Sequence, residues 1–302
     1  MNKYMNSLLF TGASGYIGSK VLPLLCEKYL VDTLSFSDSS TYNVNLAEQV
    51  PVLNKQYNIV LHAAGKAHSF SDTEEEAQSF YHVNYQGTKN LCAGLTGCGI
   101  PQSFIFISTV AVYGCDSGER ITEDHPLNSD TAYGKSKIQA EKYLLEWCDR
   151  YGVLLTILRP SLLAGSRPPG NLGAMISGIS TGRYASIAGG KVKKSIAMAE
   201  DIGWLVPYCE GKFGIFNLCD DYNPSFNELE ELISKQLDRS LPVNIPLIIA
   251  KFLAKLGDLF NLSLLNTRKL SKMTNSLTFS NEKLKKELGF NPSDVLKNFS
   301  IY

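Results

Sequence analysis

The sequence predicts an α/β protein in which a doubly wound parallel sheet is followed by a smaller C-terminal lobe. Short β-rich apolar runs alternate with longer helical stretches through about the first 200 residues. A glycine-rich turn follows the first apolar run, and after Arg159-Pro160 the composition shifts toward Gly, Ser and Pro. A chain of 302 residues is long enough to bury a large core and to divide it into two lobes.

The predicted sheet is built from five apolar runs with β-branched and aromatic residues. They are Ser7–Thr11, Thr33–Phe36, Ile59–His62, Phe104–Ser108 and Val153–Leu158. The stretches between them have the length that a right-handed crossover between parallel strands needs. The helices predicted there are Ile17–Lys28, Glu74–Leu95 and Thr131–Arg150.

The sequence after Arg159-Pro160 predicts a different arrangement of elements. Gly165–Gly190 is rich in Gly, Ser and Pro and predicts loops and short elements. Gly214–Cys219 predicts one more strand, which we expect to return to the first lobe. Further helices are predicted at Phe226–Leu237, Ile248–Leu259 and Asn281–Leu288. We therefore expect a dinucleotide-binding lobe at 1–164, rejoined by 213–220, and a substrate-binding lobe made of 165–212 and 221–302.

Composition excludes several classes of protein. Lys plus Arg and Asp plus Glu are both 29, so no overall charge would attract nucleic acid or an acidic membrane. No apolar run approaches the roughly 18 residues of a membrane span, and no secretory apolar region opens the chain, so we expect a cytoplasmic protein without nucleic-acid or membrane partners. The seven cysteines and four histidines lack the spacing of metal ligands, and no metal site is predicted.

The turn after the first strand is the first candidate site. Gly12, Gly15 and Gly18 are spaced three and three between a strand and a helix, which is typical of a Rossmann-like phosphate loop. The first glycine permits the tight turn, the second lets a pyrophosphate approach, and the third lets the helix sit close to the sheet. The helix N-terminus then offers free N–H groups to phosphate. A glycine-rich turn without a ligand is the alternative.

A residue near the end of the second strand usually meets the adenosine ribose in this fold. Asp38 stands twenty residues after Gly18, but Ser35 and Ser37 compete for that position. No Arg follows to hold a 2′-phosphate, so the sequence leaves NAD and NADP both open.

A tyrosine and a lysine four residues apart begin the helix at Thr131–Arg150. Tyr133 and Lys137 share one face of that helix, and an ammonium beneath a phenol favours the phenolate. Ser108 and Thr109 end a buried strand, where active sites of open parallel sheets gather. A buried Tyr with a snorkelling Lys, and hydroxyls that cap a turn, are the purely structural alternatives.

These segments together resemble the extended short-chain dehydrogenase/reductase family, in the nucleotide-sugar epimerase/dehydratase group that includes UDP-glucose 4-epimerase. The matching segments appear in family order: TGASGYIG (Thr11–Gly18), HAAG (His62–Gly65), VNYQGTKNL (Val83–Leu91), STVAVYG (Ser108–Gly114), YGKSK (Tyr133–Lys137) and LRPSLLAG (Leu158–Gly165). The tail, with its closing helix and Gly-aromatic-x-Pro ending, resembles the 4-ketoreductases and epimerase-like proteins of bacterial polysaccharide pathways.

The resemblance implies a set of site residues. The catalytic residues it implies are Thr109, Tyr133 and Lys137. The residues it implies for NAD or NADP are Gly12, Gly15, Tyr16, Ile17, Gly18, Asp38, Asn45, Ala63, Ala64, Gly65, Asn84, Ser108, Tyr133, Lys137, Pro160 and Leu162. The residues it implies for the substrate are Thr109, Tyr133, Asn171, Leu172 and Lys194.

Three positions depart from the family pattern. Asn45 stands where many relatives have an aspartate, and Lys194 where they often have an arginine that grips phosphates in a bidentate way. Family dehydratases carry Asp-Glu directly after the catalytic Thr, whereas this chain has Val110-Ala111. Apolar side chains cannot eliminate water from a sugar, so a 4,6-dehydratase is not expected.

The resemblance therefore implies hydride transfer at C4 of a UDP- or dTDP-linked hexose, by a 4-epimerase or a 4-ketoreductase, in polysaccharide precursor synthesis. It also implies a homodimer that pairs through the helices at Glu74–Leu95 and Thr131–Arg150. The alternative is a catalytically silent sensor or scaffold that binds NAD(P) on the same fold, because a fold does not determine a function.

Overall fold

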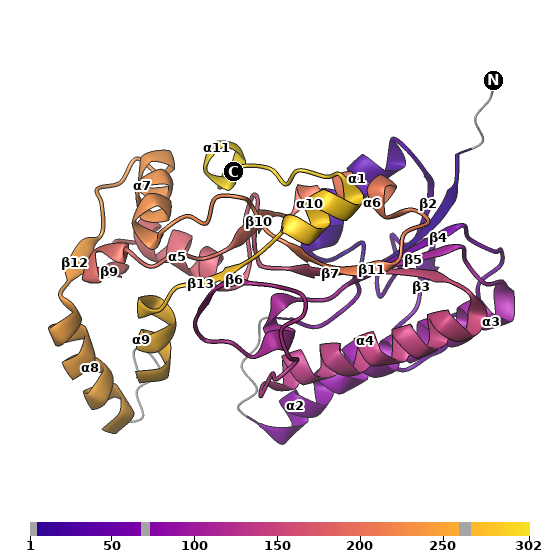
Figure 1. The fold of residues 1–302 in the computed structure, drawn as a ribbon, viewed down its shortest axis with the longest axis horizontal. Helices are drawn as coiled ribbons and strands as arrows, with labels where there is room; N and C mark the ends of the chain where they lie inside the picture. The colour runs from indigo at the N-terminus through magenta and orange to yellow at the C-terminus, as the bar shows by residue number, and fades with distance from the viewer. Residues whose placement is uncertain (1–4, 68–72, 260–266) are drawn as a thin grey trace.

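A parallel sheet forms the centre of the molecule. The computed structural model describes residues 5–67, 73–259 and 267–302, and in this part of the chain seven parallel strands follow the order β11-β7-β5-β4-β1-β2-β3 (Figure 1). They are β1 (Ser7–Thr11), β2 (Leu30–Ser35), β3 (Tyr42–Asn43), β4 (Ile59–His62), β5 (Ser103–Ile107), β7 (Leu154–Pro160) and β11 (Gly214–Leu218). The predicted α/β fold with a doubly wound sheet is confirmed.

The strand order reverses direction next to the first strand. From β1 the chain builds β2 and β3 toward one edge, and then crosses back to place β4, β5, β7 and β11 on the other side. The carboxyl ends of β1 and β4 are neighbours, with Thr11 paired to His62. In open α/β sheets ligands bind in the crevice at such a switch point.

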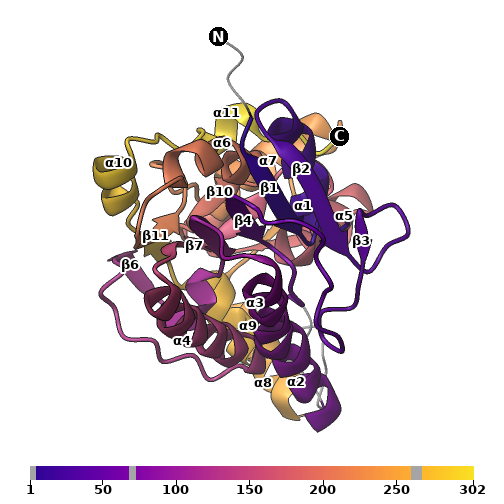
Figure 2. The same ribbon diagram turned by 90° about the vertical axis from the view of Figure 1, so that its right-hand side faces the viewer.

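Helices cover both faces of the sheet (Figures 1 and 2). On one face lie α3 (Gly87–Cys98) and α4 (Ala132–Tyr151), and on the other lie α1 (Tyr16–Cys26), α6 (Glu200–Cys209) and α10 (Glu282–Leu288). Apolar side chains of α4 such as Leu144 and Trp147 pack against sheet residues, as the predicted stripe requires. This burial holds the start of α4 beside the ends of the strands.

The helix predicted at Glu74–Leu95 begins as expected but is not continuous. It divides into α2 (Glu74–Phe80), a π-helical turn (Tyr81–Gln86) and α3. Thr73 accepts a hydrogen bond from the Glu76 N–H and caps its start. The wider turn carries Asn84, and such turns occur often at functional sites.

The smaller lobe has its own apolar core, to which α5 (Gly170–Ser180), α7 (Phe226–Gln236) and α11 (Val295–Asn298) contribute. The prediction of loops for Gly165–Gly190 is wrong where α5 forms. Leu172, Met175 and Ile179 are spaced as one helix face and are buried, so their burial outweighs the helix-breaking glycines.

Short elements complete this lobe and its border. They are β6 (Gly118–Ile121) with β13 (Leu277–Phe279), β8 (Leu162–Ala164) with β10 (Ile196–Met198), β9 (Ala185–Ile187) with β12 (Val243–Ile245), and the helices α8 (Leu247–Leu259) and α9 (Thr267–Thr274).

Parts of the chain that the sequence assigns to the smaller lobe also pack on the sheet. Gly214 of β11 pairs in parallel with Thr156 of β7, so this strand extends the sheet. Helices α6 and α10, which the sequence analysis assigns to the smaller lobe, also pack on the sheet: Ile202, Leu205 and Leu284 are buried with residues of α1 and β1. The chain therefore passes between the smaller lobe and the sheet more than once.

Candidate active site

The loop between β1 and α1 has the geometry of a phosphate cradle. Gly12 has φ of +82°, and a Cβ there would stand 2.6 Å from the Ala64 backbone nitrogen, so only glycine fits. Gly15 is the N-cap of α1 and supplies no side-chain cap, which leaves N–H groups of the first turn open to an anion. Gly18 faces the loop, not the sheet: its Cβ would lie 2.1 Å from the Ala13 carbonyl oxygen.

The residues beyond β2 lie in an exposed turn. Asp38 is exposed, three positions after the last residue of β2, and accepts a hydrogen bond of 2.7 Å from Asn43. Ser35 is buried and hydrogen-bonds the Ser40 hydroxyl. Asn45 begins a turn by accepting from the Ala47 N–H at 3.1 Å. The roles of Asp38 and Asn45 at the adenosine stay predictions.

The loop after β4 passes directly over the helix that carries the predicted tyrosine and lysine. The Ala63 N–H donates to the Thr11 carbonyl at 3.1 Å, which joins this loop to the end of β1. A Cβ on Gly65 would lie 2.9 Å from Asn84 Oδ1 and 3.1 Å from Lys137 Nζ. Ala63, Gly65, Asn84 and Lys137 are thus brought to one place.

Asn84 fixes this loop through three hydrogen bonds. Its Oδ1 accepts from the Lys66 N–H at 2.7 Å, and its Nδ2 donates to the Lys66 carbonyl at 3.1 Å and to Ser136 Oγ at 2.9 Å. Because Asn84 is fully buried, these bonds satisfy an amide that water cannot reach. The Asn84 side chain therefore holds the Lys66 backbone in place, and its role toward a cofactor stays a prediction.

Tyr133 and Thr109 meet at the carboxyl end of β5. Thr131 caps α4 by accepting from the Gly134 N–H at 3.1 Å, and Tyr133 follows in the first turn. The Thr109 hydroxyl is a polar neighbour of the Tyr133 hydroxyl, and the Tyr133 ring lies 5.9 Å from the Phe80 ring. Burial raises the pKa of Tyr133, while the neighbouring Thr109 hydroxyl opposes this effect.

Lys137 lies one turn further along α4 and is buried. Its ammonium donates to the Ile107 carbonyl at 2.9 Å and lies 4.7 Å from the centre of the Phe106 ring. Burial lowers the pKa of Lys137 to about 8, and the nearby Glu141 carboxylate opposes this shift. Lys137 lies on the same helix face as Tyr133, and its effect on a Tyr133 phenolate stays a prediction.

Beneath these residues lies a buried ion pair that the sequence analysis does not identify. Arg159 Nη2 and Nε donate to the two carboxylate oxygens of Glu141 at 2.6 and 3.1 Å, and Ser108 donates to the same carboxylate. Arg159 also donates to the Tyr113 hydroxyl at 3.1 Å, which in turn donates to Asn217 at 2.6 Å. Two sequence features could have pointed to this pair: Glu141 follows Lys137 by four residues on the same helix face, and Arg159 is a charged residue within an apolar strand.

Several buried polar atoms near these elements have no hydrogen-bond partner among the described residues. They include Tyr16 Oη, Ser161 Oγ and one carboxylate oxygen of Glu200. A Cβ at Gly165 would lie 2.8 Å from the Tyr16 hydroxyl and 3.4 Å from Glu200, so the Tyr16 and Glu200 side chains meet beside Gly165. Buried groups without partners usually await a ligand or water. Together with the glycine cradle, they fit a large polar cofactor.

The remaining residues predicted to contact the cofactor lie in or next to strands β5, β7 and β8 and in helix α1. Pro160 ends β7 and is buried, and Leu162 begins β8 and is half-buried. Ser108 is buried, its hydroxyl donates to Glu141, and its N–H donates to the Leu158 carbonyl at 2.7 Å, so its predicted contact with the cofactor stays a prediction. Ile17 is half-buried in α1 and packs against the core beneath the glycine loop.

These features are shared by a known group of enzymes. Residues 8–202 match the model of the NAD dependent epimerase/dehydratase family. The chain belongs to this family. The family description agrees with the expectation that NAD or NADP is the cofactor.

Members of this family with curated functions include two 4-epimerases. The chain is 28% identical over 251 residues to an N-acetyl-alpha-D-glucosaminyl-diphospho-ditrans,octacis-undecaprenol 4-epimerase of Escherichia coli O157:H7, covering 78% of this chain and 74% of that protein. It is 27% identical over 321 residues to the UDP-glucose 4-epimerase of Vibrio cholerae, covering 98% and 93%. The solved UDP-glucose 4-epimerase of Thermotoga maritima superposes with a TM-score of 0.75 at 20% identity, over 98% of this chain and 96% of that one.

The predicted substrate residues of this family member lie on the smaller lobe and its border. Asn171 is exposed in the first turn of α5, whereas the Leu172 side chain is buried in that lobe's core. Lys194 donates to the Asn275 carbonyl at 2.9 Å, and burial lowers its pKa to about 8. The role of these three residues toward a substrate stays a prediction, and that of Leu172 would involve its backbone.

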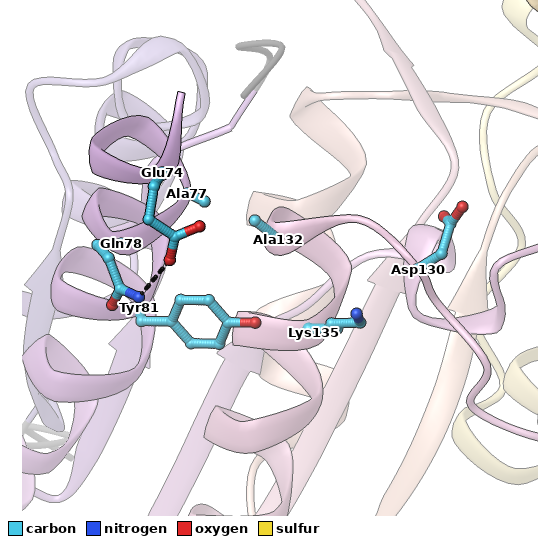
Figure 3. A pocket seen from close by; sticks show the side chains of 7 residues that line it. All are labelled: Glu74, Ala77, Gln78, Tyr81, Asp130, Ala132 and Lys135. Atoms are coloured by element: carbon cyan, nitrogen blue, oxygen red, sulfur yellow. Dashed lines mark hydrogen bonds between the residues drawn. The ribbon is translucent and has the colours of Figure 1, made fainter. Parts of the chain in front are cut away.

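A pocket of about 470 Å³ opens between α2 and the start of α4 (Figure 3). The residues that line it are Glu74, Ala77, Gln78, Tyr81, Asp130, Ala132 and Lys135. In Figure 3 the Tyr81 ring extends toward α4, and Glu74 accepts a hydrogen bond of 2.9 Å from Gln78. Tyr133 and Lys137 do not line this pocket, which lies on the helices through which a dimer is predicted.

Among the described residues, no group of three or more His, Cys, Asp or Glu is arranged to hold a metal ion, and His68 lies outside them. No helix in the described ranges is both long and apolar enough to cross a membrane.

Proposed function

We propose that this protein is a 4-epimerase that acts on a hexose joined through a diphosphate to uridine or deoxythymidine. The observation that carries the proposal is that Tyr133, Thr109 and buried Lys137 come together at the end of β5. Two relatives with curated 4-epimerase function support the choice of reaction. Such a reaction would serve polysaccharide precursor synthesis.

The side chains of the site have separate roles. Tyr133 takes the proton of the sugar hydroxyl and later returns it, and the charge of Lys137 favours the phenolate that results. Thr109 holds the sugar oxygen in line with Tyr133. A bound nicotinamide supplies the hydride acceptor and donor. The loop from Gly12 to Gly15 would hold its diphosphate, and Ala63–Gly65 would line its binding crevice.

The segment after Thr109 supports epimerisation over dehydration. Val110 and Ala111 begin a short 3-10 helix, and the Ala111 N–H donates to Thr109 Oγ1 at 3.1 Å. Neither side chain can donate or accept a proton, so the acid and base that eliminate water from a sugar are missing at these positions.

On the substrate side we propose that Asn171 and Lys194 approach the diphosphate. Lys194 gives charge without the bidentate geometry of arginine, so its contact with the diphosphate would depend less on the group attached at the far side of that diphosphate. The second candidate substrate is therefore a hexose joined through a diphosphate to a polyprenol instead of a nucleoside. The Escherichia coli relative acts on such a lipid, and the exposed face of α8, described below, favours this class.

The direct test replaces the predicted base. Tyr133→Phe removes the proton-transferring hydroxyl and should lower kcat by about 100- to 10,000-fold while NAD binding stays unchanged. Tyr151→Phe is the matched control, because Tyr151 lies on the same helix with a 38% exposed side chain and should keep full activity. Near wild-type turnover of Tyr133→Phe would refute the assignment.

Cofactor retention separates the proposal from its two alternatives. An epimerase recycles its cofactor, so NAD should leave the purified protein only on denaturation and UDP-hexoses should interconvert. Reversible exchange of NADPH or NADH, with reduction of a UDP-4-keto sugar, would identify a 4-ketoreductase. Binding without turnover on any of these sugars would identify a sensor or scaffold.

We also propose a homodimer that pairs through α2, α3 and α4. The pocket lined by Tyr81 and Lys135 lies on this face, which a partner copy would cover. Sedimentation velocity at micromolar concentration should give twice the chain mass, and a monomer there would contradict the proposal.

A further inference from the structure

Helix α8 has an unusual distribution of side chains. Its inner face is made of small residues, with Ala250 and Ala254 fully buried against Leu270 and Ile187. Its large apolar residues point outward instead: Ile248, Ile249, Phe252 and Leu253 are 84, 50, 63 and 41% exposed. A helix of a water-soluble protein normally shows the reverse pattern.

The four outward residues form one continuous surface, which we call the α8 face. They occupy positions i, i+1, i+4 and i+5, and at 100° per residue these positions span an arc of about 140°. Val243, at the start of β12, adds another apolar side chain that is 77% exposed a few residues earlier in the chain. Exposed apolar surfaces of this kind mark interaction sites.

Basic residues border the α8 face. Lys251 and Lys255 are exposed on α8, at helical positions next to Ile248 and Phe252. The only carboxylate of the helix, on Asp258, accepts hydrogen bonds from Thr267. Within residues 239–275 the sequence has six Lys and Arg against one Asp, although the whole chain is neutral. The charge is thus concentrated beside the apolar arc.

An apolar arc bordered by lysines is the pattern of a helix that lies in the plane of a membrane surface. Anionic headgroups would compensate Lys251 and Lys255 while the apolar side chains enter the acyl boundary. Pairing of two copies through this face would bring lysines together without carboxylates between them. The location also fits, because α8 lies at the outer end of the smaller lobe, away from the sheet (Figure 1).

We propose that the α8 face docks the smaller lobe on an anionic lipid bilayer. This inference goes beyond the proposed reaction and does not rest on it, because docking requires no turnover. It would give the site access to a sugar whose diphosphate is anchored in that bilayer. The neutral charge of the chain led the sequence analysis to expect no membrane partner, since an average over 302 residues hides a local cluster.

Vesicle sedimentation of the full chain tests the proposal. The wild-type protein should bind vesicles of phosphatidylcholine with 30 to 40% phosphatidylglycerol, at ~0.1 M salt, and should bind pure phosphatidylcholine at least tenfold more weakly. Ile248→Ser with Phe252→Ser should reduce binding to the anionic vesicles at least tenfold. Lys251→Gln and Lys255→Gln should each lower it by about 5-fold.

The matched control alters exposed apolar residues elsewhere. The side chains of Val52 and Phe213 are 88 and 66% exposed, and these fractions are similar to those of Ile248 and Phe252. Val52→Ser with Phe213→Ser should bind vesicles like wild type. Both double variants should keep wild-type circular dichroism and wild-type turnover of a soluble UDP-hexose, which separates loss of docking from loss of the proposed reaction.

Other outcomes would overturn the proposal. Equal vesicle binding by the α8 variant and the control would show that the face is not involved, and failure of the wild type to bind anionic vesicles would refute docking outright. A smaller oligomer on Ile248→Ser with Phe252→Ser, with no vesicle binding by wild type, would assign the face to a second copy instead.

Discussion

Removing one partner of the buried pair of Glu141 and Arg159 should be among the most destabilising single changes near the sheet. Both side chains are only 2% exposed, and three hydrogen bonds end on the carboxylate. Glu141→Ala would leave the guanidinium charged and buried with the Tyr113 hydroxyl as its nearest remaining side-chain partner. Breaking a buried pair in this way costs about 3–5 kcal/mol, a large part of the ~5–15 kcal/mol by which a typical protein is stable.

Urea denaturation followed by circular dichroism measures this loss. The control is Glu282→Ala, which breaks the ion pair with Arg120 on the surface, where the two side chains are 75 and 66% exposed. That variant should lose less than about 1 kcal/mol, because solvent screens the pair. A loss below about 1 kcal/mol for Glu141→Ala would refute the reasoning.

A double variant separates the lost charge pair from lost packing. Glu141→Leu with Arg159→Met replaces both charges by apolar groups of similar length, so no uncompensated charge stays buried. It should be more stable than Glu141→Ala and should lose about 1–3 kcal/mol, since Ser108 loses its acceptor. If the losses of Glu141→Leu and Arg159→Met, each measured alone, add up to the loss of the double variant, the two side chains are not coupled.

Two further predictions concern acid and close packing. Burial, assisted by Lys137, lowers the pKa of His62 to about 3, so the folded protein keeps this side chain neutral while the unfolded chain protonates it below about pH 6.5. The free energy of unfolding should therefore fall by about 2 kcal/mol between pH 7 and pH 5. Urea denaturation curves at the two pH values should show that His62→Gln removes this part of the fall. Gly18→Ala should lose about 2 kcal/mol or more, because the new Cβ meets the Ala13 carbonyl, whereas Gly97→Ala, which meets no atom within 4 Å, should gain about 0.5–1 kcal/mol; a gain in both variants would contradict the close approach.

The sequence predicted best where one local pattern determines the structure. Strands β1 and β4 begin and end where the apolar runs do, since fully buried parallel strands are apolar throughout. Helix α5 was missed because its glycines argue locally for loops, and only the burial of Met175 and Ile179 in the finished lobe explains it. Tertiary burial overrides propensity there.

The candidate site divides in the same way. Tyr133 and Lys137 were predicted from their local spacing and Thr109 from its place at a strand end, and the structure makes Thr109 a polar neighbour of Tyr133. Arg159 was missed as a partner of Glu141, because the two residues are 18 positions apart and meet only when β7 joins the sheet. The sequence predicted a helix at Ile248–Leu259 but not its exposed apolar side, because periodicity does not tell which side of a helix is covered.

The late return of the chain to the sheet constrains how the protein is made. One face of the sheet is completed by Leu284, Leu288 and Phe290, which lie near the C-terminus, and β11 joins the sheet only after the chain has passed through residues 165–212. A ribosome-bound nascent chain therefore exposes that apolar face until synthesis is almost finished. Folding of the sheet lobe should be post-translational, and chains that terminate early should depend on chaperones to stay out of aggregates.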